Sequence, residues 1–338
     1  MITGADIIVD LQAGDTGKGK VAHHLAGTHP YTAVIRYNGG SNAGHTMYQH
    51  GVKIVTHQVP VGILHNIPSI IGPGCVVNVP LLEQELEMLR HHGYVAPIYI
   101  DRRCHVTTSH HLEEDARDVT IGTTKQGIGP TYRDKYFRTG CRIDTLNVSS
   151  SSYTIIDIYD FLYDRNTQHR VLLEGAQGFQ IDIDWGDYPY VTSSHCTVGS
   201  VALNGIAPRY WRNIYGTMKA YETYSGYKTH YTDPAYADIF EKIQEVGQEY
   251  GATTGRKRQV RWVNLTEVVQ ALYINNVTDI IISKSDVLAQ IGTFGVKHDG
   301  VVHLFTQERH FRNFVEAILR EEYREKFTLT WSTSPEHI

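Results

Sequence analysis

Four apolar runs separated by helical stretches limit the possible folds of this chain more than any other feature. Each run is typical of a strand buried on both faces, because apolar residues follow one another without polar alternation. The runs occupy residues 5–11, 32–37, 69–79 and 95–100. Helical patterns lie between the first and second runs and between the third and fourth runs. This alternation predicts an α/β fold with a central, mostly parallel β-sheet, covering helices and long active-site loops.

The second half of the chain continues the alternation. Asp233 opens a predicted helix over 233–251, and a strand is predicted over 278–286. Asp299 and Gly300 mark a hairpin turn, after which a last amphipathic helix is predicted. The sequence contains no repeat and no low-complexity linker, so we expect a single domain over residues 1–338.

Charge and cysteine content argue against several classes of protein. A net charge of −5 disfavours a nucleic-acid binder, which normally carries a basic surface. The four cysteines form no CxxC pair and fit a reducing cytosol. No apolar run reaches the roughly 18 residues that span a bilayer, and the N-terminus lacks a signal-peptide pattern. We therefore expect a cytoplasmic protein without nucleic-acid or membrane partners.

The stretch DLQAGDTGKGKVAHHL, residues 10–25, lies where the first predicted strand meets the first predicted helix. Gly14, Gly17 and Gly19 allow close approach of the backbone, and Lys18 adds a positive charge. Such a loop before a helix can hold phosphate oxygens, although it lacks the P-loop pattern GxxxxGK(S/T). A glycine-rich turn without a ligand is the alternative.

An aspartate within a phosphate loop requires a chemical reason. The carboxylate of Asp15 would repel phosphates unless a cation lies between them or the carboxylate accepts a proton. Asp15 is therefore a candidate Mg²⁺ ligand or general base, and a solvated turn residue is the other possibility. Four glycine-rich or basic stretches accompany this loop, at 38–46, 121–142, 173–194 and 251–262.

In their order along the chain, these stretches resemble adenylosuccinate synthetases from about Asp6 to Ser334. The resemblance implies a P-loop NTPase-related fold that works as a homodimer. It also implies a ligase that joins L-aspartate to C6 of a 6-oxopurine nucleotide. A nucleoside triphosphate would drive this reaction through a 6-phosphoryl intermediate.

The resemblance implies roles for individual residues. Asp15 would take the proton from purine N1 and coordinate Mg²⁺, and the carbonyl of Gly44 would be a second metal ligand. His45 would stabilise the transferred phosphoryl group as an acid, and Lys18 would hold the triphosphate. The residues implied for the donor nucleotide are Gly14, Thr16, Gly17, Lys18, Gly19, Lys284, Asp286, Ser332 and Ser334.

The acceptor nucleotide and the aspartate substrate are assigned in the same way. The residues implied for the acceptor are Asn42, Thr124, Arg138, Gln177, Thr192 and Ser225. Among them, Arg138 would reach across the dimer to the 5′-phosphate. The residues implied for aspartate are Thr253, Thr254, Arg256 and Arg258. Two arginines suit this substrate because guanidinium groups bind carboxylates in bidentate fashion.

Departures from the family pattern narrow the expected substrates. Thr16 stands where the family usually has glutamate, and SGYKTHYTDP around Ser225 replaces the VGAGPFPTE loop. These features are similar to the phage-encoded branch, the 2-aminoadenylosuccinate synthetases, although many members of that branch lose the aspartate that this chain keeps at Asp15. We expect dGMP as acceptor, giving 2-amino-2′-deoxyadenylosuccinate for modified phage DNA, and ATP or dATP as donor. GTP is the other possible donor, since Asp286 suits a guanine amino group.

Two alternatives stay open at this point. One is an ordinary adenylosuccinate synthetase that uses IMP and GTP. The other is a nucleotide-binding switch without ligase activity.

Overall fold

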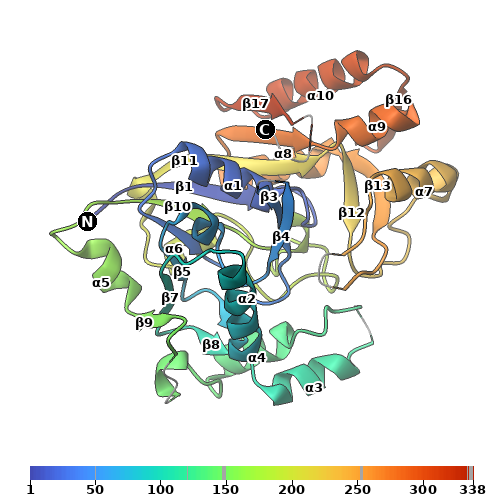
Figure 1. Ribbon diagram of the computed structural model, residues 1–338. Coiled ribbons are helices and arrows are strands. Elements are labelled where there is room, and N and C mark those ends of the chain that lie inside the picture. The colour runs from blue at the N-terminus through green and yellow to red at the C-terminus, as the bar shows by residue number, and fades with distance from the viewer. Residues whose placement is uncertain (50, 120, 147–149, 252–253, 333, 335–337) are drawn as a thin grey trace.

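Seventeen strands and ten α-helices make up the described part of the chain (Figure 1). The computed structural model describes residues 1–49, 51–119, 121–146, 150–251, 254–332, 334 and 338. The strands of the largest sheet are β1 (Ile2–Asp10), β2 (Ala33–Arg36), β5 (Ser69–Ile71), β7 (Ile98–Asp101), β9 (Thr154–Ile156), β10 (His169–Glu174), β11 (Trp211–Lys219), β14 (Asp279–Ser283) and β17 (Thr328–Trp331). Their order across the sheet is β17-β14-β11-β1-β10-β2-β5-β7-β9. Every neighbouring pair is parallel, which confirms the predicted α/β fold.

Smaller sheets flank this central sheet. One contains β12 (Tyr221–Tyr224), β13 (Gln259–Asn264), β15 (Phe294–His298) and β16 (Val301–Phe305). Two strand pairs complete the set: β3 (His45–Gln49) with β4 (Val52–Thr56), and β6 (Val76–Val77) with β8 (His105–Val106). The predicted hairpin joins β15 to β16, and Asp299 and Gly300 both have positive φ, as its tight turn requires.

The α-helices lie on both sides of the central sheet. They are α1 (Lys18–Thr28), α2 (Val79–His91), α3 (Ser109–Arg117), α4 (Ile128–Phe137), α5 (Ile158–Tyr163), α6 (Gly199–Leu203), α7 (Ala237–Val246), α8 (Leu265–Asn275), α9 (Ser285–Ile291) and α10 (Glu308–Glu322). Figure 1 shows α8, α9 and α10 beside β17 at one end of the molecule and α2, α3 and α4 at the other. Within the described residues, no helix is both long and apolar enough to cross a membrane.

Alternate residues of the central strands enter two separate hydrophobic cores. In β1, Ile7 and Val9 join the core that includes α8 and α10, whereas Ile8 joins the core that includes α1 and α2. The two cores explain why the strand sequences are apolar without alternation, since both faces of the sheet are covered. The unbroken apolar runs therefore correctly indicated strands that are buried on both faces of the sheet.

Two predicted elements differ from the structure in extent. The run 69–79 is interrupted by a turn at Pro73 and Gly74, so it forms β5 and the short β6 instead of one strand. The helix expected over 233–251 starts as a 3₁₀ turn that Asp233 caps through the backbone N–H of Ala235. The α-helical part, α7, begins at Ala237 and ends at Val246.

Candidate active site

Loops at the carboxyl ends of the central strands enclose a cavity of about 990 Å³. Loops that are far apart in sequence meet here because the carboxyl ends of parallel strands share one edge of the sheet. The predicted site residues that line the cavity are Gly14, Asp15, Thr16, Gly17, Lys18, Gly19, Asn42, Gly44, His45, Thr124, Gln177, Thr192, Ser225, Thr254, Arg256, Arg258, Lys284, Asp286, Ser332 and Ser334.

Two predicted residues are not placed in this cavity. Thr253 lies outside the described residues. Arg138 is exposed at the C-terminal end of α4, where its backbone adopts a positive φ of 69°, and it does not line the cavity. Its predicted role, which requires a second protomer, stays a prediction.

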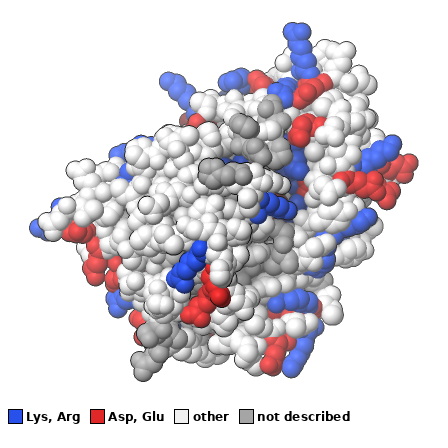
Figure 2. All heavy atoms as spheres, viewed as in Figure 1, with Lys and Arg blue, Asp and Glu red and all other residues white. Residues whose placement is uncertain are grey.

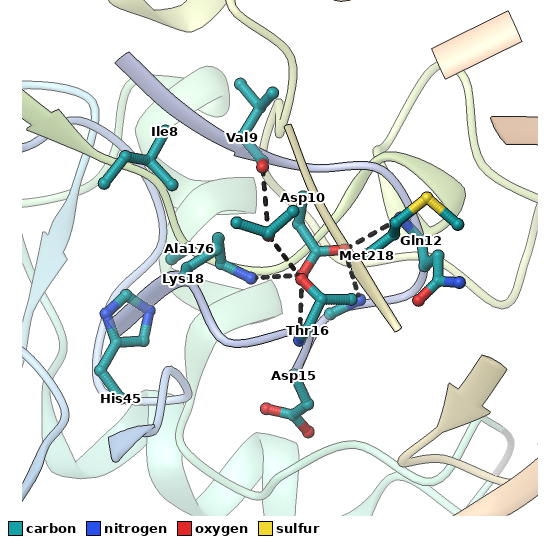
Figure 3. Close-up of polar contacts among 12 residues, drawn as sticks. Ile8, Val9, Asp10, Gln12, Asp15, Thr16, Lys18, His45, Ala176 and Met218 are labelled. Atoms are coloured by element: carbon teal, nitrogen blue, oxygen red, sulfur yellow. Dashed lines mark hydrogen bonds and ion pairs between the residues drawn. The ribbon is translucent and has the colours of Figure 1, made fainter. Parts of the chain in front are cut away.

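The loop after β1 is organised by the carboxylate of Asp10. This carboxylate accepts hydrogen bonds from the backbone N–H of Gln12, from the hydroxyl of Thr16 and from the ammonium group of Lys18 (Figure 3). The loop leads into α1, whose N-terminus has no side-chain cap and opens toward the cavity. Uncapped N–H groups at a helix N-terminus form an anion-binding site.

Asp15 points away from the Asp10 carboxylate (Figure 3). Its backbone has a φ of 57°, and its side chain is about one quarter exposed. One carboxylate oxygen, Oδ2, lies 2.7 Å from Nη2 of Arg258 and accepts a hydrogen bond of 3.1 Å from the hydroxyl of Ser225. Burial alone would raise the pKa of Asp15, but the positive charges of Arg258, Lys219 and Lys18 outweigh it and lower the pKa. The carboxyl is therefore ionised at neutral pH.

A buried carboxylate, Glu249, holds the guanidinium of Arg258 from its other side. Glu249 accepts hydrogen bonds from Nη1 of Arg258 at 2.5 Å, from the ammonium of Lys219 at 3.1 Å and from the hydroxyl of Tyr221 at 2.7 Å. Burial would raise the pKa of Glu249, yet Lys219 and Arg258 lower it to about 2. Burial lowers the pKa of Lys219 to about 8. Alternating charges thus connect Asp15, Arg258, Glu249 and Lys219.

His45 belongs to a second buried charge cluster. Its Nδ1 contacts Glu174, which also accepts a 2.7 Å hydrogen bond from Arg36. Burial and the charge of Arg36 lower the pKa of His45 to about 4, so the imidazole is neutral at pH 7. Burial would raise the pKa of Glu174, but Arg36 and His45 lower it to about 2, so this carboxylate is ionised and can only accept. We therefore infer that Nδ1 of the neutral ring carries the proton and that Nε2 does not.

Two amide oxygens in the cavity are candidates for contact with a ligand. Oδ1 of Asn42 and Oε1 of Gln177 are buried, and within the described chain neither has a hydrogen-bond partner. Gln177 also has a positive φ of 58°. A buried polar atom without a partner costs free energy, and such atoms beside a cavity are expected to pair with a ligand.

Three predicted ligand-binding residues already have protein partners. Arg256 donates to the backbone carbonyls of Gly122 and Thr123. Lys284 donates to the carbonyl of Gly247 at 2.8 Å. Both the hydroxyl and the backbone N–H of Thr16 donate to Asp10.

The charged side chains of the surface are mixed in sign. On the face drawn in Figure 2, lysine and arginine side chains alternate with aspartate and glutamate side chains. This face therefore shows no extended patch of one sign.

The cavity contains oxygen groups of the kind that Mg²⁺ prefers. Asp15 contributes a carboxylate and Gly44 a backbone carbonyl, and both line the cavity beside Lys18. Hard oxygen ligands together with phosphate oxygens form typical magnesium sites in phosphoryl-transfer enzymes. The donor set fits Mg²⁺.

A sequence model of the adenylosuccinate synthetase family matches residues 7–154 and 148–300. The chain belongs to this family. Adenylosuccinate synthetase of Chlorobium chlorochromatii is 37% identical over 336 residues, which cover 84% of this chain and 77% of that protein. The enzyme of Fusobacterium nucleatum is 35% identical over 351 residues, covering 88% of this chain and 82% of the relative.

Solved structures of the family have the same fold. Fully ligated adenylosuccinate synthetase from Plasmodium falciparum superposes with a TM-score of 0.84 at 25% identity, covering 98% of this chain and 97% of that one. Cyanophage S-2L succinoaminodeoxyadenylate synthetase, bound to dGMP and dATP, gives a TM-score of 0.72 at 20% identity, covering 95% and 100% of the two chains. The chain is thus a C–N bond-forming ligase that joins aspartate to a purine nucleotide.

The sequence analysis did not identify four charged residues that lie at the ends of buried strands and organise the site. Arg36, Glu174, Asp10 and Lys219 are the last residues of β2, β10, β1 and β11, which are adjacent in the sheet. A charged residue that closes an apolar run was the available signal, since burial of a charge requires a partner nearby. Glu249 lies in the loop after α7 and gave no comparable signal.

Proposed function

We propose that this chain joins L-aspartate to C6 of a guanine nucleotide, with dGMP as the acceptor. The proposal rests on one observation: the carboxylate of Asp15, the phosphate loop and Arg258 face the same cavity. Asp15 would take the N1 proton of the purine, and O6 would attack the γ-phosphate of the donor with release of the diphosphate. The aspartate amine would then displace phosphate from C6.

The other cavity residues would bind and orient the substrates. Lys18 and the N-terminus of α1 would hold the triphosphate, and Arg258 would bind a carboxylate of aspartate. Asp15 and the carbonyl of Gly44 would hold Mg²⁺, which supplies charge neutralisation at the phosphates when bound. The negative triphosphate would raise the pKa of His45, so that Nε2 gains the proton needed to stabilise the transferred phosphoryl group.

Ser225 supports a guanine acceptor over hypoxanthine. Its hydroxyl donates to Asp15, so the serine oxygen keeps its lone pairs for another donor. C2 of the purine is bonded to N1, the atom that Asp15 would deprotonate. A group on C2 would therefore lie near Ser225. The 2-amino group of guanine can donate to this oxygen, whereas hypoxanthine presents only C–H.

Asp286 supports GTP as the donor. It lies in the first turn of α9 and lines the cavity together with Ser332 and Ser334. A carboxylate accepts from both N1–H and the 2-amino group of guanine, whereas adenine presents a lone pair at N1. ATP and dATP are the other donors to be compared.

We also propose that the chain forms a single domain over 1–338 and works as a cytoplasmic homodimer. Strands from both ends of the chain share the central sheet. The side chains of Tyr136 and Phe137 are exposed beside Arg138 at the end of α4, which would suit an interface with a second copy.

The dimer can be tested by mixing two inactive variants. An equal mixture of Arg138→Ala and Asp15→Asn is expected to recover about a quarter of wild-type activity, because half of the dimers are mixed and each contains one complete site. Each variant alone gives the baseline. Recovery no greater than the sum of the two baselines would place Arg138 outside the partner's site.

The acceptor is tested by phosphate release with dGMP, GMP or IMP, each with aspartate and with GTP, ATP or dATP. We expect wild type to prefer dGMP, and Ser225→Ala to lower kcat/KM for dGMP about 10-fold because an N–H of the amino group loses its partner. In the same variant, kcat/KM for IMP should change less than threefold.

Two results would contradict parts of this proposal. Preferential turnover of IMP by wild type would make the chain an ordinary adenylosuccinate synthetase. Phosphate release that needs neither aspartate nor a purine monophosphate would instead indicate a nucleotide-binding switch.

A further inference from the structure

Asp10 is a buried carboxylate at the end of a central strand. It is the last residue of β1, which lies between β11 and β10 in the central sheet, and only 1% of its surface is exposed. An ionised carboxylate is stable in such a position only when donors surround it. The identity of those donors indicates what Asp10 does.

Among the residues that the structure describes, the hydrogen-bond donors to Asp10 all come from the phosphate loop. Oδ1 accepts from the N–H of Gln12 at 2.9 Å and from the N–H of Gly14 at 3.4 Å. Oδ2 accepts from the N–H of Thr16 at 3.4 Å, the hydroxyl of Thr16 and the ammonium of Lys18 at 2.7 Å (Figure 3). The donors are therefore every second residue of the loop. Alternate N–H groups converge on one anion because Gly14 and Gly17 have positive φ.

The hydroxyl of Thr16 extends this contact into the sheet. It lies 2.6 Å from the hydroxyl of Thr217 in β11, which in turn donates to the carbonyl of Val9. Thr16 and Asp10 thus tie the loop to two adjacent strands. Glutamate, the residue usual in the family at position 16, would place a second carboxylate beside Asp10, whereas threonine supplies a donor.

Lys18 is held in a definite orientation by the same carboxylate. The side chain of Lys18 is 4% exposed, the residue lines the cavity, and its ammonium has three donor positions. Asp10 takes one of them, and the described part of the chain offers Lys18 no second hydrogen-bond partner. Two donors are left for phosphate oxygens.

We propose that Asp10 is a positioning residue for the donor triphosphate, because its carboxylate fixes the phosphate loop and aims the ammonium of Lys18 into the cavity. This inference rests on the proposed function, in which Lys18 binds the triphosphate. Asp10 itself is covered by the loop and does not touch the substrate.

The test compares Asp10→Asn with Asp6→Asn. Asn has the shape of Asp but loses the charge that orients Lys18. Asp6 is a matched control, since it is a fully buried carboxylate in the same strand whose partners, Tyr31, Arg170 and Asn213, lie outside the cavity. Steady-state KM is measured for the triphosphate that wild type uses, for the acceptor and for aspartate.

We expect Asp10→Asn to raise KM for the triphosphate about 10-fold, the effect of losing a charge-assisted contact. KM for the acceptor and for aspartate should stay within twofold, and Asp6→Asn should leave all three within twofold. In a Lys18→Ala background, Asp10→Asn should have a smaller effect on KM, because the two residues act together.

An unchanged KM for the triphosphate in folded Asp10→Asn would overturn the proposal, and so would an equal rise in all three KM values. If Asp10→Asn does not fold, Thr16→Val carries the test, since it removes one donor to Asp10 and is expected to raise the same KM two- to fivefold. A wild-type protein that needs no aspartate for turnover would instead contradict the proposed function.

Discussion

Replacing Asp15 by asparagine is expected to lower kcat by about 10³-fold, the upper part of the usual range for loss of a general base. Asparagine keeps the shape of the side chain, and its oxygen can still accept the hydrogen bond from Ser225 and lie beside Arg258. It cannot take a proton from purine N1. The measurement is phosphate release at saturating substrates, with circular dichroism to verify the fold.

The two oxygens of Asp15 have different surroundings. Ser225 and Arg258 both bind Oδ2, and among the described residues no donor contacts Oδ1. Oδ1 is therefore the oxygen available to a proton or a metal ion. Because neighbouring cations lower the pKa of Asp15, the wild-type rate should persist to lower pH than an ordinary carboxylate would allow.

A matched control for this substitution is Asp160→Asn. Asp160 is an exposed aspartate on α5 and does not line the cavity. Its substitution should leave kcat within twofold. A kcat for Asp15→Asn within 10-fold of wild type would show that Asp15 is not the base. The pH dependence of the wild-type rate would then reflect the titration of another group.

Local patterns in the sequence were sufficient for the fold, whereas the roles of most individual cavity residues came from the family resemblance. Apolar runs predicted the strands because both faces of the sheet are buried. Glycine-rich loops after those runs indicated a phosphate-binding site, and the structure brings these loops together around one cavity because parallel strands share the edge at which their carboxyl ends lie. Hydrophobic periodicity and turn-forming residues involve positions that are close along the chain. Both can therefore be recognised in a single sequence.

Contacts between distant loops were not predictable in the same way. Asp15 and Arg258 are 243 positions apart, and nothing in either loop specifies that their side chains meet. The same holds for Ser225, whose hydroxyl direction was undetermined until its contact with Asp15 was known. These contacts depend on tertiary packing, which sets the pKa of Asp15 and the surroundings of the acceptor base.

Substitution of Arg258 is expected to have the second large effect, because two carboxylates share its guanidinium. Replacing it with lysine keeps the positive charge between Asp15 and Glu249 but removes the fork that binds a carboxylate through two N–H groups. We expect KM for aspartate to rise about 100-fold, which corresponds to loss of a strong charge-assisted pair. KM values for the acceptor and the donor should stay within threefold.

The neighbouring arginine provides the control for this substitution. Arg261 lies in β13, forms ion pairs with Glu222 and Glu267 and does not line the cavity, so Arg261→Lys makes the same chemical change outside the site. It should leave KM for aspartate within threefold. If Arg258→Lys also leaves that KM unchanged, then Arg258 holds Asp15 and Glu249 in place without binding substrate. The aspartate carboxylates would then need another cation, and Arg256, which lines the cavity, would supply it once released from the carbonyls of Gly122 and Thr123.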